Sequence, residues 1–168
     1  MLHALQVVTV ISVSVAMALA LAHALELPGK LRLTKEAYYA MQSIYYPGFT
    51  IGGIGEAGGL LLSIILLLLT PMGSADFSLT LVGLLGLIGM QAVYWIFTHP
   101  VNRFWLRGEK LGSFGSGFFS IGAKRSSSQN ETRQADWMEL RNRWEYSHVA
   151  RAVLAMLSLI CLVITLSC

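Results

Sequence analysis

Charged residues are scarce in this sequence, and cysteine is scarcer still. Asp, Glu, Lys and Arg make up 12% of the 168 residues, about half the share found in a soluble globular domain. The two cysteines, Cys161 and Cys168, lie too far apart along one predicted helix to form a disulfide with each other. The spacing motifs of covalent haem, nucleotide-phosphate, catalytic zinc and dinucleotide sites are missing. These absences exclude a disulfide scaffold and the common soluble enzyme classes, and nothing in the sequence predicts a nucleic-acid partner.

Hydrophobic residues, in contrast, make up 55% of the chain and are concentrated in four long runs. A helix of about 20 residues crosses the hydrocarbon core of a bilayer. The runs that reach this length are Leu2–Leu25, Phe49–Thr70, Phe77–Thr98 and Val149–Ser167. Because backbone in lipid must satisfy its own hydrogen bonds, we predict that each run is a helix. The predicted fold is all-α: residues 1–168 form a single integral membrane four-helix bundle in contact with membrane lipids.

The twelve Lys and Arg residues fall in only two of the links between these runs. The first link contains Lys30, Arg32 and Lys35, and the other nine cations lie in or beside the third link. The positive-inside rule places both links in the cytoplasm and both termini outside it. We therefore predict a multi-pass protein of the cell inner membrane. A cleaved signal peptide is the alternative for the first run, but no Lys or Arg precedes residue 30, as such a peptide requires.

The segments that connect the runs differ in composition. Residues 31–46 predict a short helix on the membrane surface, with Ala37, Met41, Ile44 and Tyr45 on one face and with Tyr38, Tyr45 and Tyr46 in the headgroup zone. Residues 111–135 are rich in Gly and Ser, which is typical of a flexible linker. Asp136 and Glu139 have the spacing of a helix-capping pair. We expect the fourth helix to begin there and to extend through the cytoplasm before it enters lipid.

Ionisable residues in and beside the predicted spans are the candidates for function, because each costs roughly 2.5 to 3.5 kcal/mol in lipid. His23 and Glu26 lie three residues apart at the inner end of the first predicted helix. His148 and Arg151 have the same spacing where the fourth span begins. Glu56 lies in the glycine-rich start of the second span. Glu56 is either a structural partner of Arg151 or of a histidine, or a carboxyl that handles protons or binds a ligand. Both interpretations require it to face the bundle interior.

Helical spacing places Arg141, Trp144, His148, Arg151 and Ala155 on one stripe of the fourth helix. This stripe lines a site, or it is a snorkelling arginine with an interfacial tryptophan. The histidines at the helix ends also raise haem or metal ligation. These histidines, however, do not lie at the deep, paired positions within a bundle that a bis-histidine haem favours. The sequence also lacks the Cys/His spacing of a closed zinc site. We therefore expect no metal and no cofactor.

Small and amide side chains in the spans suggest close helix contacts. Glycines at positions 48/52 and 55/59 follow the small-xxx-small pattern, which lets helices approach closely inside the bundle or in a complex. Gln91 and Tyr94 either bond across helices or point into a cavity.

Two stretches of the sequence resemble a known family. The first is Thr98-His99-Pro100-Val101-Asn102-Arg103, at the end of the third span. The second is Arg143-Trp144-Glu145-Tyr146-Ser147-His148-Val149-Ala150-Arg151, preceded by Trp137 and Leu140. Together with His23-Ala24-Leu25-Glu26, these stretches resemble the anthrone-oxygenase-like family of small four-span membrane proteins, and the resemblance covers nearly the whole chain.

The resemblance implies an activity and a set of site residues. Characterised members of the family oxidise anthrones to anthraquinones with molecular oxygen, without a known metal or flavin. The catalytic residues implied for this chain are His148, Arg151 and Asn102. The imidazole would take a proton from an acidic phenol or methylene, and Arg151 and Asn102 would hold the resulting anion. We expect the substrate contacts among His23, Glu26, Glu56, His99, Trp144 and Arg103.

These patterns lead to a functional hypothesis and an alternative of another class. The leading hypothesis is an oxygenase-like or other redox enzyme, whose lipophilic substrate enters from the bilayer and meets polar groups at the cytoplasmic face. The alternative is a non-catalytic accessory subunit or a lipid- or quinone-binding scaffold, as a homo-oligomer or in a membrane complex. A transporter is disfavoured, because there are four spans and no internal repeat. We expect six side chains to converge on one cavity: His23, Glu56, His99, Asn102, His148 and Arg151.

Overall fold

The computed structural model describes residues 2–45, 47–105 and 134–167, without the side chains of residues 50, 103–105 and 134–136. In chain order the elements are α1 (Leu2–Lys30), α2 (Lys35–Gln42), the 3-10 helix η1 (Ser43–Tyr45), α3 (Gly48–Leu69), α4 (Ala75–Val93), the π-helix η2 (Tyr94–Thr98), α5 (His99–Trp105) and α7 (Gln134–Ile164). The described residues contain no strand.

Four helical stretches are long and apolar enough to cross a membrane: Leu2–Lys30, Ile51–Leu69, Ala75–Asn102 and Trp137–Ile164. The chain is a small multi-pass membrane protein. The prediction of an all-α four-helix bundle is confirmed, because the four long helices correspond to the four apolar runs.

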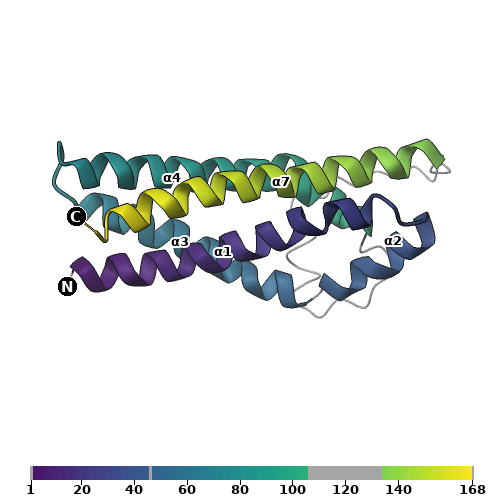
Figure 1. Ribbon diagram of the computed structural model, residues 1–168, viewed down its shortest axis with the longest axis horizontal. Coiled ribbons are helices and arrows are strands. Elements are labelled where there is room, and N and C mark those ends of the chain that lie inside the picture. Colours follow the sequence, from purple (N-terminus) through teal and green to yellow (C-terminus); the bar gives the residue numbers. More distant parts are fainter. Residues whose placement is uncertain (1, 46, 106–133, 168) are drawn as a thin grey trace.

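The four long helices run in alternating directions along one bundle (Figure 1). α1 packs against both α3 and α7, and α4 packs against α7. α3 and α4 are joined by a tight turn in which Gly73 has a φ of 86°, a backbone conformation that glycine adopts without strain. The start of α1, the end of α7 and this turn lie at one end of the bundle, and α2 lies at the other (Figure 1).

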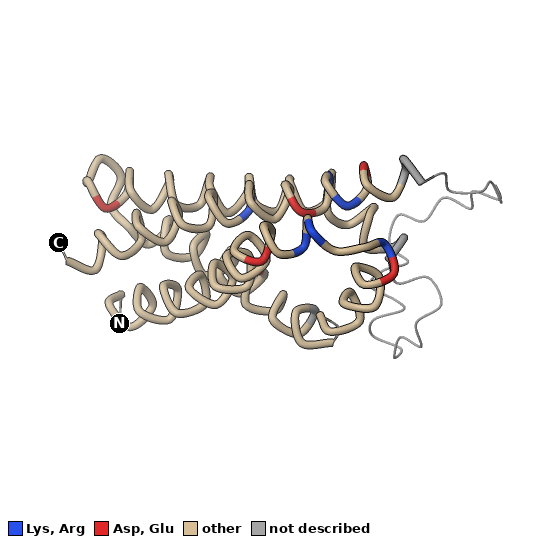
Figure 2. Tube along the Cα trace, turned by 45° about the vertical axis from the view of Figure 1, so that its right-hand side comes forward, with Lys and Arg blue, Asp and Glu red and all other residues tan. Residues whose placement is uncertain are grey.

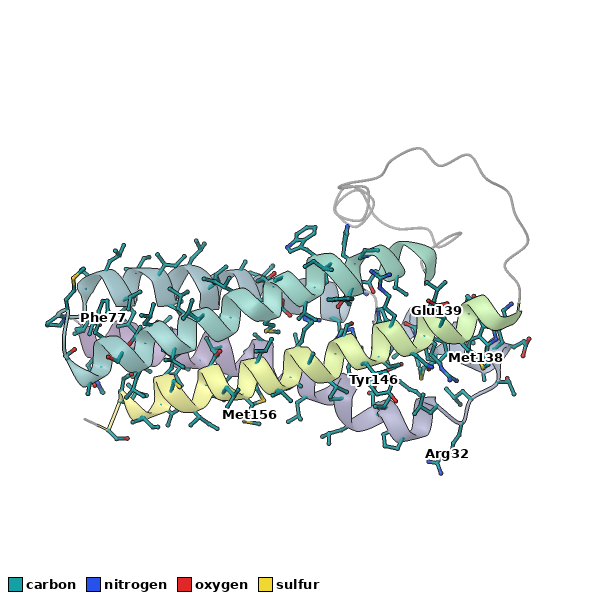
Figure 3. All side chains as sticks on the ribbon, turned by 90° about the horizontal axis from the view of Figure 1, so that it is seen from above. Arg32, Phe77, Met138, Glu139, Tyr146 and Met156 are labelled. Carbon is teal, nitrogen blue, oxygen red and sulfur yellow. The ribbon has the colours of Figure 1, made fainter. Side chains whose placement is uncertain are left out.

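Charge is distributed unevenly along the bundle. Figure 2 shows the described charged residues between the middle of the bundle and the end that carries α2, except for Asp76 in the first turn of α4. Figure 3 shows Phe77 near the turn end, and Arg32, Met138 and Glu139 near the opposite end. Many large exposed side chains along the helices are apolar, such as Leu68 and Val153. This surface suits contact with lipid tails.

The helices extend beyond the predicted spans at the polar end. α1 continues past Leu25 through Pro28 to Lys30, and the Leu31 N–H closes its last turn on the Leu27 carbonyl at 3.0 Å. α7 is already helical at Gln134, before the predicted start at Asp136, and it ends at Ile164. Most of the predicted linker 111–135 lies outside the described residues, although positions 134 and 135 belong to α7.

The short helix predicted after the first span is present as α2 and η1. The Thr34 side chain caps its start by accepting a hydrogen bond from the Ala37 N–H at 3.3 Å. The Tyr38 side chain is fully buried in the bundle, and its position in the headgroup zone stays a prediction. Its hydroxyl donates a hydrogen bond to Glu145 of α7, and this buried partner draws α2 onto the bundle through Tyr38.

Close packing of α3 on α1 depends on glycine. A β-carbon at Gly59 would lie 3.0 Å from Cγ2 of Val13, and one at Gly55 would lie 3.1 Å from Cγ1 of Val15. The 55/59 pattern therefore brings two helices of the same bundle together. A β-carbon at Gly48 would meet nothing within 4 Å, so the 48/52 pair does not act as a unit in this contact.

Candidate functional site

A pair of facing histidines lies at the centre of the polar part of the bundle. His23 on α1 and His148 on α7 have ring centres 4.1 Å apart, and each side chain is 4% exposed. The Trp144 ring lies 4.3 Å from His148 and 4.9 Å from His23, centre to centre. Tyr45 and Phe49 each place a ring centre 4.5 Å from that of His23. The histidines are thus enclosed by aromatic rings from three segments of the chain.

Glu56 faces the interior, as both interpretations of this residue require. Its Oε1 forms an ion pair with Nη2 of Arg151, and its Oε2 accepts a hydrogen bond from Nε2 of Gln91 at 3.0 Å. These contacts join α3, α7 and α4. Arg151 is 5% exposed, so it does not snorkel toward the headgroups. The structure contains the predicted partnership of Glu56 with Arg151, and Gln91 bonds across helices.

Two nitrogen atoms beside this ion pair are buried without a partner. Nη1 of Arg151 lies 3.2 Å from Nδ1 of His148. Among the described residues, Nε2 of His148 and Nε of Arg151 make no hydrogen bond to the protein. A buried polar atom without a partner costs about 1 to 3 kcal/mol, so a bound molecule that accepts hydrogen bonds from these nitrogens would be stabilised.

The end of the third span joins the same network. Nε1 of Trp144 donates a hydrogen bond to Oδ1 of Asn102 at 2.5 Å. The hydroxyl of Tyr94 lies 3.3 Å from Nδ1 of His99, and the Tyr94 ring centre lies 5.1 Å from the Arg151 guanidinium. The six side chains predicted to converge therefore belong to one continuous set of contacts.

A second buried charged cluster lies next to the histidines, at the α2 end. Nζ of Lys30 lies 2.9 Å from Glu26 Oε2, 3.4 Å from Glu145 Oε2 and 3.2 Å from His23 Nδ1. Lys30 is 2% exposed and Glu145 is fully buried. The Tyr38 hydroxyl donates to Oε1 of Glu145 at 2.8 Å. Glu26, whose side chain is 45% exposed, lies at the rim of this cluster.

Sequence analysis missed Lys30 and Glu145 as site residues. Lys30 lies beyond the predicted end of the first span at Leu25 and therefore counts among the cations of the first link. Glu26 and Lys30 have the four-residue spacing of a helical ion pair, and His23 lies one turn further back. This signal becomes visible only when the helix is continued through the proline. For Glu145, no local pattern separates a buried carboxylate from an exposed one.

Two tyrosines of the α2 segment have perturbed acidity. Burial raises the pKa of Tyr38 far above its usual range, and the neighbouring Glu145 carboxylate raises it further. Burial also raises the pKa of Tyr45, whose hydroxyl donates to Glu26 at 2.6 Å. Both phenols therefore remain protonated hydrogen-bond donors at neutral pH.

The remaining candidates are Arg141, Trp144 and Arg103. Arg141 stacks over the Trp137 ring at 5.1 Å and donates to the Leu31 carbonyl at 3.4 Å. Trp144 is 3% exposed and packs inside the bundle, so it is not an interfacial tryptophan. The side chain of Arg103 lies outside the described residues. Within the described part of the chain, no group of three or more His, Cys, Asp or Glu side chains is placed to hold a metal ion.

No family model matches the sequence, and no curated protein or solved structure matches it either. The resemblance to the anthrone-oxygenase-like family therefore stays a prediction.

Proposed function

We propose that this membrane protein binds a lipophilic molecule that carries a polar oxygen, of the quinone or phenol class, at the layer formed by His23, Trp144, His148 and Arg151. The observation that carries the proposal is the buried Nε2 of His148, which has no partner in the described protein. A molecule that offers a polar oxygen to this nitrogen removes the cost of an unsatisfied group. Rings around the histidine pair provide an apolar, flat-sided environment that suits an aromatic ligand.

The test is a fluorescence titration of the purified protein in detergent. Duroquinone, a tetramethylated benzoquinone, is the probe, because a quinone near His148 would quench the neighbouring Trp144. We expect saturable quenching that is absent in Trp144→Phe and at least about tenfold weaker in binding for His148→Leu, the effect of one lost buried hydrogen bond.

The matched control is His3→Leu, because His3 is an exposed histidine at the opposite end of α1 from His23. It should bind like the wild type. Quenching that does not saturate, or that is unchanged in His148→Leu, would contradict the proposal and would favour a purely structural polar layer.

An oxygenase-like enzyme is the second candidate, and one contact favours it. The hydrogen bond from Trp144 to Asn102 joins the two sequence elements on which the family resemblance rests, which are 42 residues apart. In the implied reaction, an anthrone methylene loses two hydrogens and gains one oxygen atom as a carbonyl. The second atom of O₂ leaves as water, so one O₂ is consumed for each anthrone.

Oxygen consumption with anthrone as substrate tests this candidate. An enzyme should consume O₂ above the rate of the protein-free reaction, with one anthraquinone formed per O₂. His148→Gln should lower this rate by about 10² to 10⁴ if the imidazole acts in proton transfer, and His3→Gln should not. If the protein binds quinone but consumes no O₂ with anthrone, the binding function is supported and the oxygenase candidate fails.

We also propose a location in the cell inner membrane with both termini outside the cytoplasm. The positive-inside rule supports this orientation, since all twelve cations belong to the first and third links or their flanks. The start of α1 and the end of α7 lie together at the opposite end of the bundle from α2 (Figure 1).

A further inference from the structure

The contact between Arg151 and His148 restricts the protonation of the imidazole. A guanidinium carries only N–H donors and has no acceptor. Nη1 of Arg151 lies 3.2 Å from Nδ1 of His148, a hydrogen-bond distance. If Nδ1 carried a proton, two donors would face each other at this distance inside the bundle. Nδ1 is therefore the acceptor, and a neutral His148 carries its proton on Nε2.

Arg151 is itself held in place by residues from two other helices. Glu56 on α3 accepts from Nη2 of Arg151 through one carboxylate oxygen, and its other oxygen accepts from Gln91 on α4. Both carboxylate oxygens are thus engaged. Arg151 is buried, so turning its guanidinium away from His148 would break an ion pair that water does not replace.

We infer that Gln91 and Glu56 are positioning residues, which act through Arg151 to hold His148 in the tautomer that presents an N–H at Nε2. The site then selects a ligand with a hydrogen-bond-accepting oxygen, such as a quinone carbonyl or a phenolate. A neutral quinol is disfavoured, because its hydroxyl oxygen can accept from this nitrogen only while its own hydrogen is left without an acceptor there. The selection of a ligand rests on the proposed function. The assignment of the His148 tautomer does not depend on it.

The buried nitrogens agree with this selection. Nε2 of His148 and Nε of Arg151 are both donors in this arrangement, and both lack a partner among the described residues. Since the missing groups are acceptors, a carbonyl or phenolate oxygen satisfies them fully. A hydroxyl oxygen also accepts, but it brings a hydrogen that needs an acceptor of its own. In this tautomer His148 cannot take a proton at Nε2, so an anionic ligand has to arrive already deprotonated, and the imidazole cannot be the base of the oxygenase candidate.

The tautomer is measured by ¹⁵N NMR of the protein labelled at histidine, without any ligand. His148 is assigned by its loss in His148→Asn. We expect a protonated Nε2, together with an Nδ1 signal typical of an unprotonated nitrogen that accepts a hydrogen bond. A protonated Nδ1, whether in the other tautomer or in the imidazolium, would overturn the inference.

Gln91→Met tests the positioning role, because it removes the amide that fixes Glu56 and keeps a side chain of similar length. The Nδ1 signal of His148 should then move toward that of a nitrogen without a hydrogen bond, as it should more fully in Arg151→Met. The His3 signals are the internal control and should not move. An unchanged Nδ1 in a folded Gln91→Met would show that Gln91 has no positioning role.

Ligand selection is measured by titrating duroquinone under oxidising conditions and its quinol under reducing conditions. The wild type should bind the quinone at least about tenfold more tightly than the quinol, which corresponds to one buried hydroxyl hydrogen without an acceptor. Gln91→Met should lower this ratio of quinone to quinol affinity. Equal affinities would overturn the selection. If neither compound binds while the NMR result is as expected, the proposed function fails and the tautomer assignment stands.

Discussion

Arg151 connects the structural and the functional interpretations of the buried layer. It forms an ion pair with Glu56, which stabilises the bundle, and it contacts His148, which has the unpartnered nitrogen. Removing one partner of a buried pair is costly, because the other charge is left without compensation. The two interpretations therefore differ in how stability and ligand binding respond to the same substitutions.

A double-mutant cycle on Glu56 and Arg151 separates them. Glu56→Gln and Arg151→Met should each lower the free energy of unfolding by about 3 to 5 kcal/mol. The double variant should recover about 1 to 3 kcal/mol of the summed loss, because no unpaired charge remains. Thermal or denaturant unfolding in detergent gives these values.

Glu36→Gln is the control for this cycle, because Glu36 is an exposed carboxylate on α2. Its effect should stay within about 0.5 kcal/mol. Strong coupling between Glu56 and Arg151, combined with quinone affinity that does not depend on His148, would establish the layer as a structural clasp.

Tyr38 predicts a pH dependence of stability. Burial raises its pKa in the folded protein, whereas the unfolded tyrosine keeps a pKa of about 10. A raised folded pKa contributes stability below about pH 10, and this contribution is lost as pH rises further. The unfolding temperature of the wild type should therefore fall above about pH 10. The unfolding temperature of the Tyr38→Phe variant should fall less steeply with pH.

At neutral pH, Tyr38→Phe should be less stable than the wild type by about 1 to 3 kcal/mol, because Glu145 loses a buried donor. Tyr146→Phe is the control, since Tyr146 is exposed on α7. An identical alkaline profile for the wild type and Tyr38→Phe would show that another group causes the loss.

The transition from α4 to α5 shows how a helix irregularity positions site residues. Pro100 has no N–H, so it cannot donate to the carbonyl of Ile96 four residues earlier. Nη2 of Arg143 on α7 donates to this carbonyl at 2.8 Å. The chain here forms the π-helix η2, a type of irregularity that is frequent at functional sites. The next residue, His99, contacts Tyr94 beside the buried layer.

Helix packing predicts opposite effects for two neighbouring glycines of α3. Gly59→Ala should destabilise the protein by about 1 to 3 kcal/mol, because its β-carbon would press on Val13 of α1. Gly58→Ala should be neutral or stabilising by up to about 1 kcal/mol, because its β-carbon would meet nothing within 4 Å and alanine favours helix. Thermal unfolding of the two variants checks this, and equal effects would contradict the α1–α3 contact.

The whole molecule is polar at one end and apolar along its sides, which predicts its orientation. A reporter fused after the C-terminus that is active only outside the cytoplasm should be active. A reporter inserted between α5 and α7 should be active only if it functions in the cytoplasm. The reverse pattern would overturn the proposed orientation, and the fold would remain as described.

The four spans, their alternation and the class of the fold follow from the amino-acid sequence alone, because apolar runs of this length are stable only as membrane helices. It also predicted that Glu56 and Arg151 face the interior, since exposing a charge to lipid is costly. These inferences need only the spacing of residues along one helix. They do not require knowledge of which helix is the neighbour.

Which buried groups are partners depends on how the helices pack, and it follows only from the tertiary structure. The pairs Lys30–Glu145 and Tyr38–Glu145 join segments more than 100 residues apart, and helical periodicity gives the face of a residue but not the rotation and height of the opposing helix. The same limit applies to His148. Its burial followed from the sequence, whereas its tautomer depends on a guanidinium held by Glu56 and Gln91, and such a contact exists only after three helices have packed together.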